Sequence, residues 1–151
     1  MKVRTDFVSN SSSTSFIIST DNLGISKLDT KFFKLLSRCE CLYFFAKEDG
    51  FSKELVEEAK VHFGKRLEFD ENCIELDLNS IKLADKDAMS VVKKLLAEAE
   101  SVTCSYGCDD CGEYVGEATQ VCTILELLYG IVPEGDDHFY YDSIKRLEVE
   151  L

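Results

Sequence analysis

Apolar residues recur along the chain with two different spacings. A repeat of three to four residues predicts amphipathic helices, whereas strict alternation or a short continuous apolar run predicts strands. By this criterion four segments are helical, namely 29–37, 52–63, 85–99 and 117–129. Ser52 and Asp85 are suitable N-caps, and Gly64 is expected to end the second helix.

Strand-like segments alternate with these helices. They cover 16–20, 42–46, 66–69, 73–78, 102–106 and 147–151. The short link 70–72 favours a hairpin between the third and fourth of them. This order of elements predicts an α+β fold, a single domain with one mixed β-sheet and helices packed on one or both faces. We expect the domain to span 16–151 and to follow a serine-rich N-terminal tag or loop over 1–15.

The charge of the chain narrows the classes of partner. Its 151 residues include 17 basic and 29 acidic side chains, which gives a formal net charge of −12. Long-range repulsion argues against nucleic acid and anionic membranes as ligands and leaves basic proteins, cations and mimicry of DNA. A well-solvated acidic surface without a ligand explains the same numbers. The partner class that fits best is a basic protein.

The expected compartment determines the redox state of the cysteines. No stretch of the sequence has the apolar length of a membrane span, and the N-terminus lacks the apolar core of a secretory signal, so we expect a cytoplasmic protein. Cysteines in that compartment stay reduced. The chain has seven cysteines, an odd number that cannot all pair within one chain. The sequence therefore predicts thiols, with or without a metal, instead of a disulfide framework.

One run of cysteines suggests chemistry. Its spacing, Cys-x3-Cys-x2-Cys-x10-Cys, predicts a candidate zinc site formed by Cys104, Cys108, Cys111 and Cys122. Cys39 or Cys41 is an alternative ligand that the fold would have to bring in. A redox pair at Cys108 and Cys111 is disfavoured, because the two aspartates between them raise the thiol pKa values. A further interpretation is that several cysteines are small hydrophobic residues of the core.

The first three cysteines of this run also resemble the iron–sulfur motif of radical S-adenosylmethionine enzymes. That family carries the motif near the start of a long barrel domain, commonly with an aromatic residue just before the third cysteine. Here the motif begins at Cys104, and Asp110 takes the aromatic position. Too little chain follows to build the barrel, so we treat the match as a coincidence.

An uninterrupted polar run joins two apolar anchors near the N-terminus. The residues concerned are Phe7, Val8, Asn10, Ser11, Ser12, Ser13, Ser15 and Phe16. Over residues 1–18 this string resembles an N-terminal signature of many otherwise dissimilar, uncharacterised proteins of low-GC bacteria and their phages, with Thr14 in place of a usual serine. The resemblance implies a short tag that other machinery reads, modifies or processes. The alternative is a loop whose hydroxyls satisfy backbone groups before the first strand.

The remaining residues predict no named reaction. The two histidines, His62 and His138, have no sequence-adjacent partner of a known nucleophile motif, and the eight glycines do not cluster into a phosphate-binding loop. Two functions are left. The first is a non-enzymatic protein-interaction module whose acidic surface engages a basic partner. The second is a zinc-binding or thiol protein that uses the cysteine run, and we prefer the first because its acidity is read directly from the sequence.

Overall fold

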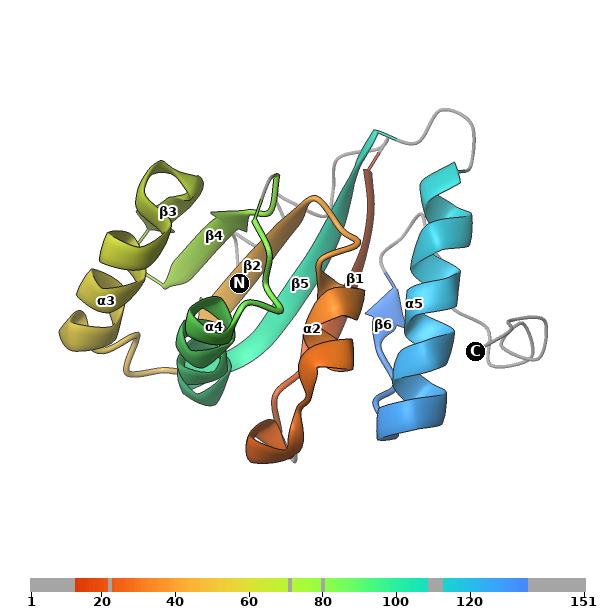
Figure 1. Ribbon diagram of the computed structural model, residues 1–151, viewed down its shortest axis with the longest axis horizontal. Coiled ribbons are helices and arrows are strands. Elements are labelled where there is room, and N and C mark those ends of the chain that lie inside the picture. The colour runs from red at the N-terminus through yellow and green to blue at the C-terminus, as the bar shows by residue number, and fades with distance from the viewer. Residues whose placement is uncertain (1–12, 22, 71, 80, 109–112, 136–151) are drawn as a thin grey trace.

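The computed structural model describes residues 13–21, 23–70, 72–79, 81–108 and 113–135. Its helices and strands follow one another in a single layer of helices over a single sheet (Figure 1). In chain order they are β1 (Ser13–Ser19), η1 (Ile25–Lys27), α2 (Thr30–Leu36), β2 (Cys41–Ala46), α3 (Lys53–Phe63), η2 (Gly64–Arg66), β3 (Leu67–Asp70), β4 (Cys73–Asp77), α4 (Lys86–Glu98), β5 (Ala99–Cys108), α5 (Glu113–Tyr129) and β6 (Glu134–Gly135).

The strands form one sheet in the order β3-β4-β2-β5-β1-β6. This confirms the predicted α+β class with a single sheet. Every described strand pair is antiparallel, however, whereas the sequence predicted a mixed sheet. Strands that run in the same direction are therefore separated by an antiparallel strand and are never neighbours in the sheet.

The four α-helices connect the strands in one repeating manner. α2 leads from β1 to β2, α3 from β2 to β3, α4 from β4 to β5, and α5 from β5 to β6. Each connection passes over one strand of the sheet to reach a strand of the same direction. Connections of this kind have a strongly preferred right hand, and a shared hand places all their helices on one face. Figure 1 shows all four helices on the side of the sheet that faces the viewer.

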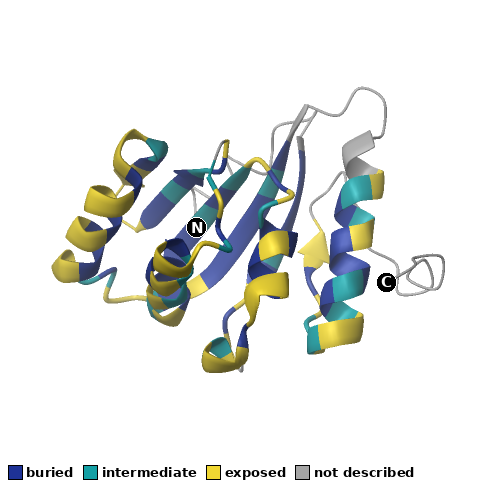
Figure 2. Ribbon diagram, viewed as in Figure 1, coloured by how far each residue is buried: buried dark blue, intermediate teal, exposed yellow. Residues whose placement is uncertain are grey.

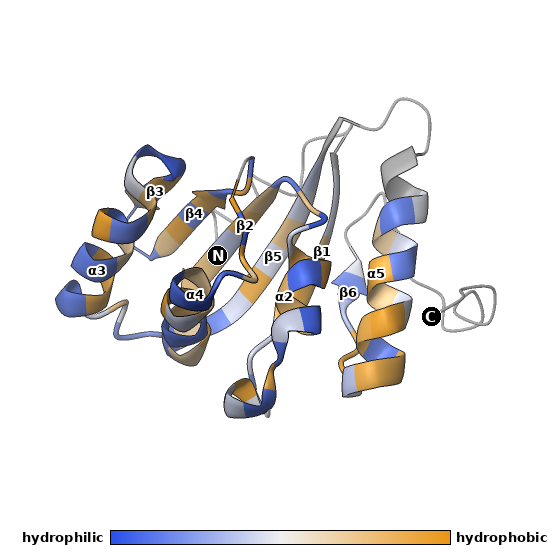
Figure 3. Ribbon diagram, viewed as in Figure 1, coloured by the Kyte–Doolittle hydropathy of each residue, from blue (hydrophilic) through white to orange (hydrophobic). Residues whose placement is uncertain are grey.

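The core lies between this layer of helices and the sheet. Its strand residues occupy alternate positions and include Phe16, Ile18, Leu42, Phe44, Ile74, Leu76, Val102 and Cys104. The register places them side by side, so that Leu42 lies opposite both Leu76 and Cys104. Figure 2 shows the helix surfaces that face the sheet as buried, and Figure 3 shows hydrophilic residues on the outer side of α3. One sheet face and one stripe of each helix thus build the core.

The helix ends agree with the capping residues read from the sequence, with one exception. The Ser52 hydroxyl accepts a hydrogen bond from the Leu55 backbone N–H, and Gly64 ends α3 with a positive φ of 57°. Asp85 occupies the N-cap position of α4, yet its side chain makes no capping hydrogen bond. The first turn of α4 therefore lacks the usual side-chain acceptor.

Some element boundaries differ from the expected ones. β1 begins at Ser13, so that Ser13, Ser15 and Phe16 of the predicted tag belong to the sheet, because β5 is long enough to pair with them up to Cys108. The other predicted tag residues lie outside the described residues: Phe7, Val8, Asn10, Ser11 and Ser12. The expected strand 147–151 also lies outside them. α5 begins at Glu113, four residues earlier than the apolar spacing predicted.

Within the described ranges, no helix combines the length and the apolar character that a membrane span requires.

Candidate functional site

The face of the sheet opposite the helices, called here the polar face, has a different composition from the core face. The strand registers assign its residues, since directly opposed side chains point to the same side. They are Ser15, Ile17 and Ser19 from β1, Cys41, Tyr43 and Phe45 from β2, Glu68 and Asp70 from β3, Cys73, Glu75 and Asp77 from β4, and Ser101, Thr103 and Ser105 from β5. Carboxylates, thiols and hydroxyls thus dominate this surface, in contrast to the helix-covered one.

The carboxylates of the polar face gather at one end of the sheet. We call Glu68, Asp70, Glu75 and Asp77 the acidic strip. Glu68 lies directly opposite Glu75 in the antiparallel register. Like charges in such a pair destabilise a sheet, because their Cβ atoms lie about 4.5–5.5 Å apart. In the part of the chain that the structure describes, none of the four carboxylates forms a salt bridge.

The acidic strip changes the proton affinity of its neighbours. Burial, together with the charges of Glu68 and Asp77, raises the pKa of Glu75. Burial and the charges of Glu75 and Asp77 raise the pKa of Cys41 to about 11. The pKa of Tyr43, which lies opposite Glu75, is also raised, mainly by burial and then by that carboxylate. The Cys41 thiol and the Tyr43 hydroxyl therefore hold their protons at neutral pH.

A second thiol on the polar face behaves in the same way. Cys73 is buried at the start of β4, opposite Phe45 on one side and Asp70 on the other. Burial and the nearby Glu75 and Asp70 raise its pKa to about 12. A thiol nucleophile must first lose its proton. Neither thiol of this face is thus prepared for nucleophilic attack.

The structure brings together two of the four cysteines of the predicted zinc site. Cys104 on β5 and Cys122 on α5 are both completely buried in the core and lie close to each other. Burial raises the pKa of both thiols, and for Cys104 a hydrogen bond with Cys39 adds to the effect. Cys39 itself donates a hydrogen bond from its sulfur to the Leu36 carbonyl oxygen at 3.0 Å. This third cysteine came only as an alternative ligand in the sequence interpretation.

The other two predicted ligands are not placed by the structure. Cys108 is the last residue of β5, but its side chain and the whole of Cys111 lie outside the described part. Among the residues that are described, no group of three or more His, Cys, Asp or Glu side chains has an arrangement suited to a metal ion. Cys39, Cys104 and Cys122 are buried in the core, which fits the interpretation of these cysteines as small hydrophobic core residues.

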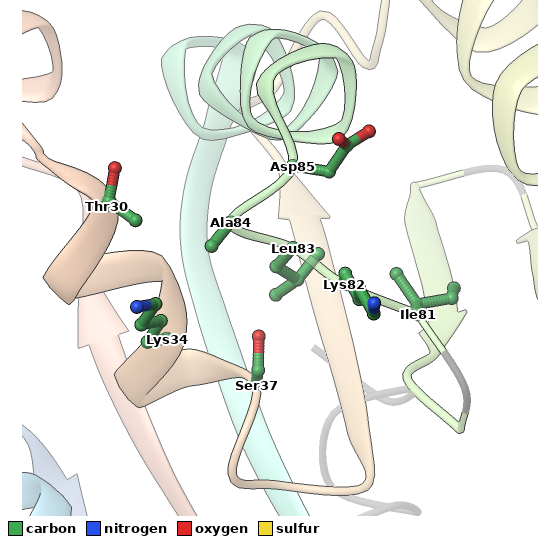
Figure 4. Close-up of a pocket in the computed structure, with 8 residues that line it drawn as sticks. All are labelled: Thr30, Lys34, Ser37, Ile81, Lys82, Leu83, Ala84 and Asp85. Atoms are coloured by element: carbon green, nitrogen blue, oxygen red, sulfur yellow. The ribbon is translucent and has the colours of Figure 1, made fainter.

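The helix side of the molecule carries a hollow of about 450 Å³ between α2 and the segment 81–85. Figure 4 shows the eight lining residues: Thr30, Lys34, Ser37, Ile81, Lys82, Leu83, Ala84 and Asp85. The Ser37 hydroxyl donates to the Phe33 carbonyl oxygen, so it is already engaged within α2. Figure 4 also shows the Asp85 carboxylate turned away from Thr30 and Lys34. The size suits a small molecule, and two of the lining side chains are cationic.

The acidic strip was not named from the sequence, although a signal for it existed. The alternating pattern of 66–69 and 73–78 placed the carboxylates on one side of a hairpin. What the pattern could not supply was the register, which sets Glu68 against Glu75, or the position of this hairpin at the edge of the sheet.

Comparisons with known proteins add no relative to this description. No protein-family model matches the chain, and no similar protein was found among curated proteins or solved structures.

Proposed function

We propose that this protein is a non-enzymatic interaction module that binds a basic protein segment through the acidic strip. The observation that carries the proposal is the direct opposition of Glu68 and Glu75, flanked by Asp70 and Asp77, without a salt-bridge partner among the described residues. Such an arrangement costs stability in the free protein. A cationic partner would remove that cost, and opposite charges across an interface also accelerate association.

The position of the strip supports this function. β3 is an edge strand with four residues, so one side of its backbone has no neighbouring strand in the described sheet. Glu68 and Asp70 on it are exposed, whereas Glu75 and Asp77 on β4 are half-buried. A basic segment that approaches the edge would therefore meet the exposed carboxylates first. The half-buried pair would then strengthen the attraction, because water screens it less.

The alternative, a zinc or thiol protein that uses Cys104, Cys108, Cys111 and Cys122, stays a prediction. The side chain of Cys108 and the whole of Cys111 lie outside the described part of the chain, and the other two residues are buried, protonated thiols. These features support a packing role for Cys104 and Cys122. We therefore place the interaction function first.

Titration with a synthetic lysine-rich peptide tests the proposal. The variant Glu68→Gln/Glu75→Gln removes two charges from the strip, and Glu48→Gln/Asp49→Asn removes two from an exposed turn elsewhere. We expect the strip variant to bind the peptide about tenfold more weakly than the turn variant at low salt, with the difference fading as salt is added. Equal affinities of the two variants would overturn the proposal, because net charge alone would then explain the binding.

A further inference from the structure

The outer edge of β3 has an open backbone beside the acidic strip. β3 lies at one margin of the sheet and β6 at the other, and among the described strands β3 pairs with β4 alone (Figure 1). Backbone N–H and C=O groups at such an edge can pair with a further strand. We propose that the basic partner binds here as an added β-strand in which cationic and apolar side chains alternate. This inference rests on the proposed function and adds the conformation and the side-chain pattern of the partner.

The side chains of β3 give this edge two chemically different sides. Glu68 and Asp70 point to the polar face and are exposed. Phe69, between them, points to the other face, because it lies directly opposite the core residue Ile74. An added strand that continues the pleat would place every second residue beside the carboxylates and the residues between them beside Phe69.

The surroundings of Phe69 favour an apolar residue at the intervening positions. Phe69 is 40% exposed, so an apolar side chain of the partner would bury more of its ring. The ammonium of Lys60 on α3 lies 5.9 Å from the ring centroid, and its ion pair with Glu57 is long, at 3.9 Å. A cationic side chain at this position would therefore meet a like charge. Cations fit one side of the edge and apolar groups fit the other.

Charge decides which strand can add to the edge. Carboxylates on an edge strand commonly protect it from pairing with other chains. If a second copy of this protein added through its own β3, Glu68 and Asp70 of the two copies would oppose one another and destabilise the pair. A strand with lysine or arginine at alternate positions forms opposite-charge pairs instead. The same two carboxylates thus exclude a second copy and admit a basic strand.

Two end-blocked peptides of equal composition test the alternating pattern. Lysine and valine alternate in the first, whereas in the second all lysines precede all valines. We expect the parent protein to bind the alternating peptide at least about fivefold more tightly, because only this order places every lysine on the polar face and every valine beside Phe69. Fluorescence anisotropy at low salt is the measurement.

Backbone methylation of the alternating peptide tests the strand pairing itself. Successive backbone N–H groups of a strand point to opposite sides, so methyl groups on the lysine nitrogens and on the valine nitrogens of the backbone block different sides. We expect one of the two methylated peptides to bind at least about tenfold more weakly and the other to change by less than about twofold. Each methylated peptide is the matched control for the other, and the protein is unaltered in both measurements.

A substitution in the protein tests the apolar side of the edge. Phe69→Thr removes the ring and keeps a residue that favours strands. Val61→Thr is the control, since Val61 is an exposed apolar residue of α3. We expect Phe69→Thr to weaken binding of the alternating peptide by about three- to tenfold and Val61→Thr to leave it unchanged.

The outcomes distinguish this inference from the proposed function. Equal binding of the two peptides and equal losses for the two methylated forms would overturn the added strand, and the proposed function would stand if Glu68→Gln/Glu75→Gln still weakened binding. If that strip variant bound as the parent does, the proposed function would be overturned and the added strand with it. A dimer in sedimentation that Phe69→Thr dissociates would identify a second copy as the occupant of the edge and would also overturn the inference.

Discussion

The two faces of the sheet are made by the same strands but differ in the chemistry of their side chains. On β2, Phe44 faces the helices and is completely buried, whereas its neighbour Tyr43 faces the other way and is half-buried beside Glu75. The core face holds apolar residues matched across strands, and the polar face holds carboxylates opposed to each other. The comparison teaches that the core face can provide stability while the polar face keeps an arrangement that costs some of it.

The polar face is not exposed to solvent along its whole width. Phe45 and Thr103 on it are almost completely buried, although the four described helices all lie on the opposite face. Burial on this face is greatest along the central strands and least at β3, where Glu68 and Asp70 are exposed. The acidic strip is therefore a feature of one edge and not of the whole face.

The largest expected effect is a difference in stability between substitutions at two neighbouring residues, one on each face of the sheet. Phe44→Ala removes a completely buried ring from the core face and should lower the free energy of unfolding by about 3–5 kcal/mol. Tyr43→Ala removes a half-buried ring from the polar face and should cost clearly less. Urea denaturation of both variants measures the difference. Equal losses would mean that the polar face is packed as tightly as the core, which would break the comparison.

A smaller effect compares two cysteines of the same sheet. Cys104→Ser places a hydroxyl in the apolar core and should lower the free energy of unfolding by about 1–3 kcal/mol. Cys41→Ser on the polar face, where the thiol is half-buried, should change it by less than about 0.5 kcal/mol. Urea denaturation without added metal, followed by a repeat with added zinc, is the measurement. A large zinc-dependent stabilisation of the parent that Cys104→Ser abolishes would show that Cys104 is a ligand and not a packing residue.

The smallest effect concerns the pH dependence of the acidic strip. The pKa of Glu75 in the folded protein is raised above its ordinary value of 4.5, so the folded state holds this proton more tightly than the unfolded chain does. Its contribution to stability is fully present below pH 4.5 and is lost as the pH rises through the folded pKa. Glu75→Gln should therefore raise the melting temperature at neutral pH, by an amount that corresponds to roughly 0.2–1 kcal/mol, and the gain should shrink in acid.

Asp29 provides the matched control with the opposite sign. Its carboxylate accepts hydrogen bonds from the Tyr129 hydroxyl and the Phe32 backbone N–H, which lower its pKa below the ordinary value of 3.8. The stabilisation is present above pH 3.8 and is lost as the pH falls through the folded pKa. Asp29→Asn should thus lower the melting temperature at neutral pH and have little effect in strong acid. The same direction for both variants would contradict the assignment.

The sequence predicted the elements well because most of them have one apolar stripe with a clear period. The helices around Phe33, Val56, Val92 and Val121 were found, and the hairpin 66–78 was found with its alternation. β6 was missed, since Glu134 and Gly135 are too few to show a period and form a strand only by pairing with β1. Long-range pairing of this kind is decided by the whole fold and not by local pattern.

The candidate sites were harder to predict for the same reason. The hollow between α2 and the segment 81–85 joins two parts of the chain that are far apart in sequence, and no spacing along the chain signals that meeting. The buried neighbours of Cys104 include Cys39, which lies sixty-five positions earlier in the sequence and approaches only because β2 pairs with β5. Spacing instead favoured Cys108 and Cys111, which are close to Cys104 along the chain. No spacing along the chain indicates that Cys39 and Cys104 are neighbours.

The place of β1 in the sheet has a consequence for the order in which the protein is made. β1 is the first described strand to leave the ribosome, but its partners are β5 and β6, which end at Cys108 and Gly135. Until then its backbone has no strand to pair with, and contacts that join such distant segments form slowly. Phe16 and Ile18, which are buried in the finished fold, therefore lack their native strand neighbours for most of the synthesis.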